Sequence, residues 1–179
     1  DATKGQEIMA LLSKAAMEKD DVARMEALIE LEKKMQDKPD NPEGWAMLAR
    51  GYKLLGRWDD AAKALARVGP SLNQDANLLT ELAEVLAQKN HSFAGRASEL
   101  IVQAQKLAPD HERVLYLAGA AAYDQEQYAV AEKYWQQLLK KMNPQSEEAR
   151  MLTAGIAQAM KMQGKVGGEP EQTASAEDK

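Results

Sequence analysis

The sequence contains no cysteine, which excludes disulfide bonds, thiolate metal ligands and a cysteine nucleophile. It has only two histidines, His91 and His111, and both fall in expected turns. No HExxH motif or carboxylate cluster has the spacing of metal ligands, so we expect no metal and no cofactor. The carboxylate pairs Asp59-Asp60 and Glu147-Glu148 each open an expected helix, where negative charge is favourable. We therefore expect a protein that is not an enzyme.

Basic stretches and long apolar runs are also missing. The net charge is −5 and both signs are mixed along the chain, so the basic stripe of a nucleic-acid-binding protein is absent. No run approaches the roughly 20 apolar residues of a membrane span, and we expect no membrane contact by this segment itself. Because the chain starts at Asp1 and not at Met, we expect it to be part of a longer or processed protein whose upstream segment could carry an anchor.

The residues that are abundant favour helix. Aromatic residues make up only 5% of the chain, whereas Ala, Leu, Met, Gln, Glu and Lys are frequent. These residues lose little side-chain freedom in a helix, and no alternating run of Val, Ile and Thr suggests a strand. The composition therefore predicts an all-α fold.

An internal repeat defines the kind of helical fold. Trp45, Leu48, Ala49 and Tyr52 follow the first-helix signature of the tetratricopeptide repeat (TPR), and Gly56 then ends the helix. The same positions return one repeat later and again in a third unit, as Leu79, Leu82 and Ala83 and then as Leu115, Ala118 and Gly119. The small residues expected in the second helices are Ala61, Ala97 and Ala131. Successive hairpins of this kind stack to form a continuous core, so we expect Trp45, Tyr52, Leu82, Ala97 and Ala131 to be buried.

The repeat predicts a TPR right-handed superhelical solenoid of helical hairpins with capping helices at both ends. The expected segments are N-terminal helices with a degenerate half-repeat (1–41), three TPR repeats (42–144), a C-terminal capping helix (145–163) and a disordered tail (164–179). Ser146 is expected to cap the last helix. We expect four side chains of this helix to cover the open end of the solenoid: Met151, Leu152, Ile156 and Met160.

The concave surface of a TPR solenoid is lined by the first helix of each hairpin, and its positions outside the signature point into the groove. The candidate partner-binding residues are Met47, Arg50, Lys53, Asn77, Glu81, Glu84, Arg113, Tyr116, Leu117 and Tyr123, with Glu43, Thr80 and Ala120 beside them. This mixture suits an amphipathic helix with one apolar face. Ala46 and Arg50 occupy positions where the carboxylate clamp of chaperone-binding TPRs has Lys and Asn, which argues against binding of an Hsp tail.

Most of the chain, and residues 82–139 most specifically, resembles a particular family. The segments Ala94-Gly95-Arg96, Leu117-Ala118-Gly119 and Tyr134-Trp135 are similar to the periplasmic domain of the cytochrome c-type biogenesis TPR proteins, the CcmI/CycH/NrfG group. The resemblance covers about residues 25–160. It implies a non-catalytic domain that holds the C-terminal helix of apocytochrome c and presents it to the haem lyase complex. It also implies a periplasmic location and a membrane-anchored parent protein.

One other function remains open. A TPR scaffold for another bacterial envelope assembly, such as a secretion, pilus or cell-wall complex, would have the same repeat. Upstream membrane spans or neighbouring genes for haem handling would favour the role in cytochrome maturation.

Overall fold

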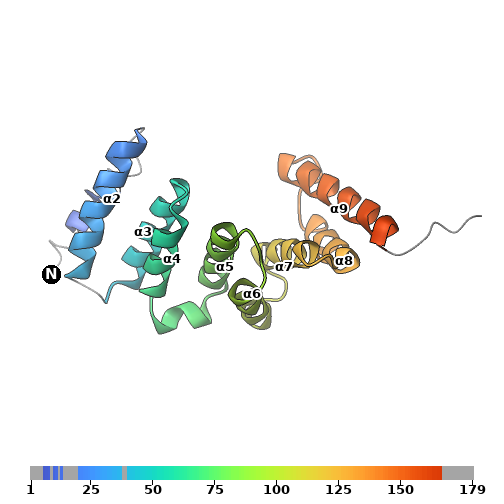
Figure 1. Cartoon of the computed structure of the whole chain (residues 1–179), viewed down its shortest axis with the longest axis horizontal. Helices are drawn as coiled ribbons and strands as arrows, with labels where there is room; N and C mark the ends of the chain where they lie inside the picture. The colour runs from blue at the N-terminus through green and yellow to red at the C-terminus, as the bar shows by residue number, and fades with distance from the viewer. Residues whose placement is uncertain (1–5, 9, 12, 14–19, 38–39, 167–179) are drawn as a thin grey trace, which may run out of the picture. The chain divides into compact units, whose positions relative to one another are not determined.

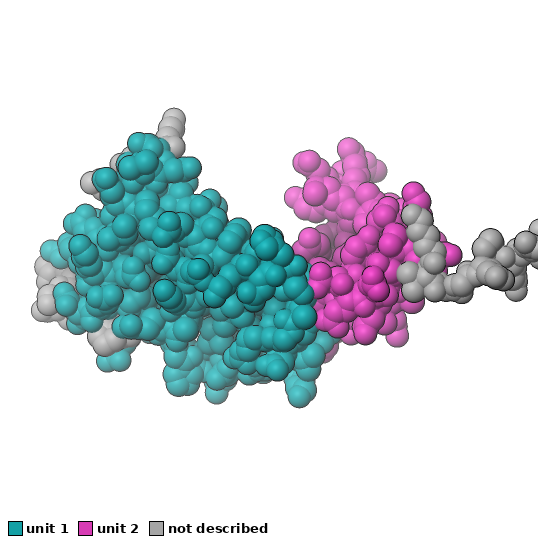
Figure 2. All heavy atoms as spheres, viewed as in Figure 1, with its two compact units in different colours: residues 1–108 teal, residues 109–179 magenta. Residues whose placement is uncertain are grey.

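The computed structural model describes residues 6–8, 10–11, 13, 20–37 and 40–166, and no strand occurs among them. The all-α prediction is confirmed for this part of the chain. The helices are α2 (Asp21–Gln36), α3 (Pro42–Leu54), α4 (Trp58–Ala66), the 3₁₀ helix η1 (Pro70–Gln74), α5 (Ala76–Asn90), α6 (Arg96–Leu107), α7 (Glu112–Asp124), α8 (Tyr128–Leu139) and α9 (Glu147–Val166) (Figure 1). The chain divides into two compact units, residues 1–108 (unit 1) and 109–179 (unit 2) (Figure 2). The boundary falls within the segment 42–144 that was expected to hold three repeats.

Several helices in both units begin at a side-chain cap, whereas α4, α6 and α8 have none. The carboxylate of Asp20 accepts a hydrogen bond from the Val22 amide at 3.1 Å, and Asn41 caps α3 by accepting from Gly44 at 2.9 Å. Such caps satisfy amides that have no partner within the helix. In unit 2, the Nδ1 atom of His111 accepts from the Arg113 amide at 3.2 Å and so caps α7. His111 is therefore more than the turn residue expected from the sequence.

In unit 1, two glycines bring α2 and α3 into close contact. A Cβ atom placed on Gly44 would lie 2.6 Å from Cε of Met35, and one on Gly51 would lie 2.6 Å from Cδ2 of Leu28. Both distances are far shorter than carbon–carbon contacts in packed interiors. Met35 and Leu28 are themselves almost completely buried, so the missing side chains of α3 allow α2 to pack tightly on it.

The residues of the repeat signature form the core, as expected. Trp45, Tyr52, Leu82, Ala97 and Ala131 are all buried. Within unit 1, α3 packs on α4 and α5 packs on α6, which gives the helical hairpins that the signature predicts. The turns between hairpin partners use left-handed backbone conformations, with φ of +68° at Gly56 and +80° at Gly95.

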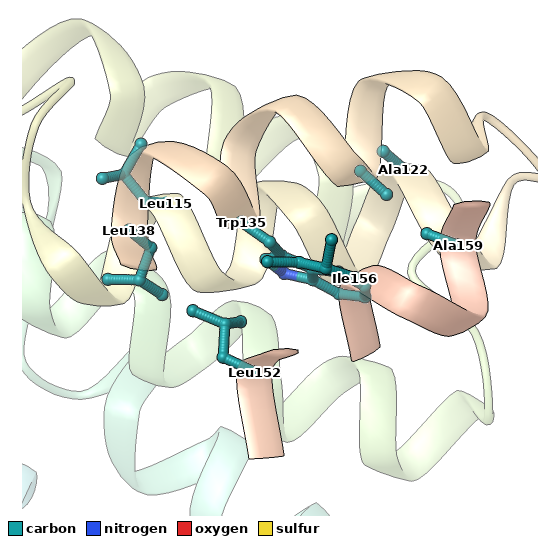
Figure 3. Packing of buried hydrophobic residues seen from close by; sticks show 8 residues of the cluster. Leu115, Ala122, Trp135, Leu138, Leu152, Ile156 and Ala159 are labelled. Atoms are coloured by element: carbon teal, nitrogen blue, oxygen red, sulfur yellow. The ribbon is translucent and has the colours of Figure 1, made fainter. Parts of the chain in front are cut away.

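Unit 2 is organised around Trp135. Its core contains Leu115, Ala122, Ala131, Trp135, Leu138, Leu152, Ile156 and Ala159, contributed by α7, α8 and α9 (Figure 3). Figure 3 shows the indole in the middle of the labelled residues. The indole Nε1 donates a hydrogen bond to the carbonyl oxygen of Tyr116 at 3.1 Å, which satisfies its buried N–H group.

Gly119 makes this position of the indole possible. A Cβ atom at Gly119 would lie 2.1 Å from Nε1 of Trp135, so any other residue would displace the ring. Two of the sequence segments that carried the family resemblance, Leu117-Ala118-Gly119 and Tyr134-Trp135, therefore contact each other directly in the fold.

The last helix, α9, covers α8 with one face only. Ser146 caps the helix as expected, because its hydroxyl accepts from the Ala149 amide at 3.1 Å. Leu152 and Ile156 are buried as expected, but Met151 and Met160 are 70% and 54% exposed, which corrects their assignment to the covering face. The other buried positions on this face are the small side chains of Ala149, three positions before Leu152, and Ala159, three positions after Ile156. Residues 164–166, expected to begin the disordered tail, are instead helical in α9, and the rest of the expected tail lies outside the described residues from residue 167 onward.

Candidate protein-binding site

The charged side chains predicted to line a groove are brought together in unit 1, but they pair with each other. Arg50 and Lys53 project from α3, and Glu81 and Glu84 project from α5. The Nε atom of Arg50 lies 3.0 Å from Oε1 of Glu81, and the Nζ atom of Lys53 lies 2.7 Å from Oε1 of Glu84. Both helices carry their charged residues three positions apart, so the two pairs form side by side. We call these four residues the paired face.

The paired face changes the expected role of its residues. Glu81 is only 8% exposed and its carboxylate is paired with Arg50, so it does not line an open groove as predicted. The side chain of Arg50 remains about half exposed. Breaking the Arg50–Glu81 pair would leave a largely buried carboxylate without its cation, which is destabilising. The two ion pairs therefore stabilise the contact between α3 and α5, whether or not the same residues also bind a partner.

Other predicted residues of unit 1 lie around a shallow hollow. Met47 and Arg50 line it together with residues from α3 to α5, and its volume is about 470 Å³. Asn77 is exposed near the start of α5. Thr80 is fully buried, and its hydroxyl donates to the carbonyl oxygens of Ala76 and Asn77, so it belongs to the core and not to the groove.

In unit 2, the predicted groove residues of α7 separate into exposed and buried positions. Tyr116 is 51% exposed, and Arg113 is partly buried. Tyr123 is also partly buried, and its ring stacks on Trp135 with a centroid distance of 5.9 Å. Leu117 is only 2% exposed, which contradicts its assignment to the groove. An α-helix turns about 100° per residue, and this rotation carries Leu117 away from its neighbour Tyr116 to the buried side of α7.

An open apolar pocket lies beside Tyr116. It is formed by α7, α8, the connection after α8 and α9, has a volume of about 340 Å³, and is lined by Tyr116, Trp135, Met142, Glu148, Met151, Leu152 and Gly155. We call it the α7–α9 pocket. Most of its lining is carbon, and Glu148 is the single charged residue that lines it. A concave apolar surface with one charged group is suited to binding and orienting a ligand.

Of the residues that line the α7–α9 pocket, only Tyr116 is predicted from the sequence to lie in a binding site. Trp135 was noted only for the family resemblance, and Leu152 and Met151 were assigned to the covering face of α9. Gly155 and Met142 were not singled out. One feature of the sequence indicates that Met151 is exposed. It lies next to Leu152 and is therefore off the buried face of an amphipathic helix.

Two further features, a metal site and a membrane-spanning helix, are absent from the part of the chain that the structure describes. No cluster of three His, Asp or Glu side chains suited to a metal ion occurs among them. Within the same part of the chain, no helix combines the length and hydrophobicity that crossing a membrane requires.

Comparison with known proteins assigns the chain to a family. The family model of the cytochrome c-type biogenesis protein H TPR domain matches residues 4–149. The chain belongs to this family. The match begins well before residue 25 and ends before residue 160, so compared with the range expected from the sequence it adds the N-terminal segment and omits most of the last helix.

Curated relatives carry the same family name. The chain is 27% identical over 141 residues to the cytochrome c-type biogenesis protein CycH of Pseudomonas aeruginosa, covering 78% of this chain and 35% of that protein. It is 31% identical over 130 residues to the cytochrome c-type biogenesis protein CcmH of Escherichia coli K12, covering 70% of this chain and 36% of that protein. The chain thus spans about a third of the length of these relatives.

Solved structures show the same fold at low sequence identity. The MamA protein superposes with a TM-score of 0.63 at 14% identity, covering 95% of this chain and 99% of MamA. BtubC (BKLC) from P. vanneervenii superposes with a TM-score of 0.59 at 17% identity, covering 97% of this chain and 86% of that structure. At these identities the likeness concerns the fold alone.

Proposed function

We propose that this chain is the protein-binding TPR domain of a c-type cytochrome maturation protein. In this role it holds apocytochrome c by its C-terminal helix and presents it to the haem lyase complex on the periplasmic side of the inner membrane. The observation that carries the proposal is the open apolar α7–α9 pocket, with the exposed Tyr116 at its side, in a chain that belongs to the cytochrome c-type biogenesis family.

The physical reason is the state of the client before haem is attached. A terminal amphipathic helix of an apocytochrome has an apolar face that the haem and the rest of the protein do not yet cover. An amphipathic helix docks by placing the apolar side chains of one face into a hydrophobic groove. The α7–α9 pocket offers such a surface, and it would lose its ligand once the client's own fold covers the same face.

The proposal is tested by titrating the chain with three ligands: apocytochrome c, holocytochrome c and a synthetic peptide of the cytochrome's C-terminal helix. Isothermal titration calorimetry should show binding of apocytochrome and of the peptide, and binding of holocytochrome weaker by a factor of about ten or more. Equal binding of the holo form, or failure of the peptide to bind, would contradict the proposed mechanism. If none of the three binds, a TPR scaffold for another envelope assembly becomes the better explanation.

A further inference from the structure

We infer that the α7–α9 pocket receives two apolar side chains from one face of a partner helix, together with a lysine or arginine that pairs with Glu148. The inference rests on the proposed function because it takes the ligand to be a polypeptide. It goes further by assigning the contact to unit 2 and by specifying the ligand's side chains.

Gly155 is the first observation that supports this inference. It lies in the interior of α9, where glycine is less favourable for helix than alanine. Packing does not require it, because a Cβ atom would meet only ring atoms of Trp135, at the ordinary contact distances of 3.5–4.0 Å. Gly119 is different, since its added Cβ would collide with the same indole at 2.1 Å. A side chain at position 155 would occupy part of the α7–α9 pocket, so the glycine keeps the pocket open.

The size of the pocket indicates how much it can hold. Its volume of about 340 Å³ is more than twice the roughly 150 Å³ of an apolar cavity that binds benzene. One large side chain would leave part of this volume empty. Two side chains at positions i and i+4 of a helix lie next to each other and would fill it together.

The walls of the pocket combine a fixed ring with adaptable side chains. Trp135 is held in place by its hydrogen bond to the Tyr116 carbonyl oxygen and by its contact with Gly119. Met142 and Met151 provide flexible, polarisable thioethers that adapt to ligands of different shape. This arrangement favours apolar side chains in general over one specific residue.

Charge and composition favour as the ligand a segment of another protein that carries at least one basic residue. Glu148 is exposed at the pocket, and no ion pair engages it among the described side chains. Lys140 and Lys141, which precede Met142, do not line the pocket. The chain's own last residues, 167–179, contain no Leu, Ile, Val, Met or aromatic side chain and carry mostly negative charge, so they are unsuited to filling it. A positive residue one turn from the apolar pair would meet Glu148.

The first test uses two glycine variants of the full chain, titrated with apocytochrome c. Gly155→Ala should weaken binding roughly fourfold, as expected when one methyl group displaces apolar contact, and Gly155→Leu should weaken it further. Gly164→Ala, also in α9 but with nothing near its Cβ position, is the matched control and should leave affinity unchanged. Thermal melting should show that both alanine variants are at least as stable as the parent chain, because alanine favours helix. Unchanged affinity of both Gly155 variants would overturn the inference.

The second test concerns the charge. Glu148→Gln should weaken binding about twofold to fivefold at low salt, and the difference should shrink as salt screens the pair. Glu147→Gln removes a charge from the same first turn of α9 but from a residue that does not line the pocket, so it should have no effect. Equal effects of the two substitutions would show that only the general charge of the helix end matters and would contradict pairing with Glu148.

Two readouts separate this inference from the proposed function. In a chain with ¹³C-labelled methionine methyl groups, bound apocytochrome should shift the NMR signals of Met142 and Met151 but not that of Met35, which is buried in unit 1. If apocytochrome binds without shifting Met142 and Met151, the pocket assignment is wrong while the proposed function stands.

If apocytochrome does not bind at all, a phage-displayed library of dodecapeptides provides the test. Selection on the parent chain, with subtraction on Gly155→Leu, should enrich peptides with two apolar residues four positions apart and a nearby Lys or Arg. Absence of such enrichment would overturn the inference.

Discussion

Tyr52 illustrates how a single polar atom is accommodated in the core of unit 1. Its ring is 1% exposed at a signature position of the repeat, and its hydroxyl donates to Oε2 of Glu32 on α2 at 2.7 Å. Burial raises the pKa of the Tyr52 phenol well above its usual value of 10.0, and the hydrogen bond and negative charge of Glu32 raise the pKa further. The signature that predicts an aromatic core residue here gives no information about its partner on another helix.

This pKa shift predicts a loss of stability at alkaline pH. Below pH 10 the phenol is protonated in both states, whereas above pH 10 it ionises readily only in the unfolded chain. Stability should therefore fall as pH rises above 10, with a slope that approaches about 1.4 kcal/mol per pH unit from this residue. Tyr52→Phe should cost about 1–2 kcal/mol at pH 7 and should remove this part of the decline.

Denaturant unfolding of both proteins from pH 7 to 11 measures the effect. Because the variant retains every lysine, the difference between the two proteins isolates the phenol. The stability difference should narrow above pH 10, and parallel pH profiles would show that Tyr52 ionises equally in both states.

At the scale of the helices, glycines determine where a helix can pack closely against its neighbour. Gly44 and Gly51 allow α2 to reach α3, and Gly119 allows the indole of Trp135 to rest against α7. From the sequence alone, Gly119 is predicted only to be the small residue of a repeat signature. Its contact with Trp135, sixteen positions further along the chain, depends on how α7 and α8 fold onto each other.

Gly119→Ala should destabilise unit 2 strongly even though alanine is the better helix former. The new Cβ would lie 2.1 Å from Nε1 of Trp135 and would force the ring out of the cluster around it. We expect a loss of about 1–3 kcal/mol from overpacking, and weakening of the Trp135–Tyr116 hydrogen bond would add to it. Gly155→Ala on α9 is the control, because the same substitution meets Trp135 at an ordinary distance there. Thermal or denaturant unfolding that ranks the two variants equally would contradict this account.

For the whole molecule, the described helices form two compact units, and the chain continues beyond them at its C-terminus. The apolar side chains that stabilise unit 2 end with those of α9, and the following residues offer almost nothing to bury. On this composition we predict that residues 167–179 contribute nothing to the stability of the fold, because burial would gain too little to offset the entropy of ordering them.

Removal of residues 167–179 should therefore leave the melting temperature unchanged within error. Differential scanning calorimetry of the full and shortened chains provides the measurement. Truncation after Gly155 instead, which removes Ile156 and Ala159 from the core of unit 2, should lower stability clearly and serves as the contrasting variant. A drop of several degrees on removal of 167–179 alone would show that these residues dock on the body.

The local pattern of the sequence determined the helices, their approximate ends and the core positions of the signature. Helix propensity, caps such as Asp20 and Ser146, and the three- and four-residue spacing of apolar side chains all act within a few residues along the chain. Tertiary structure alone decided which polar groups meet and which surfaces stay open. Arg50 pairs with Glu81, Leu117 turns into the interior, and Met151 and Gly155 line a pocket with Tyr116. These outcomes depend on the rotation and packing of helices that are distant in sequence, which periodicity within one helix does not specify.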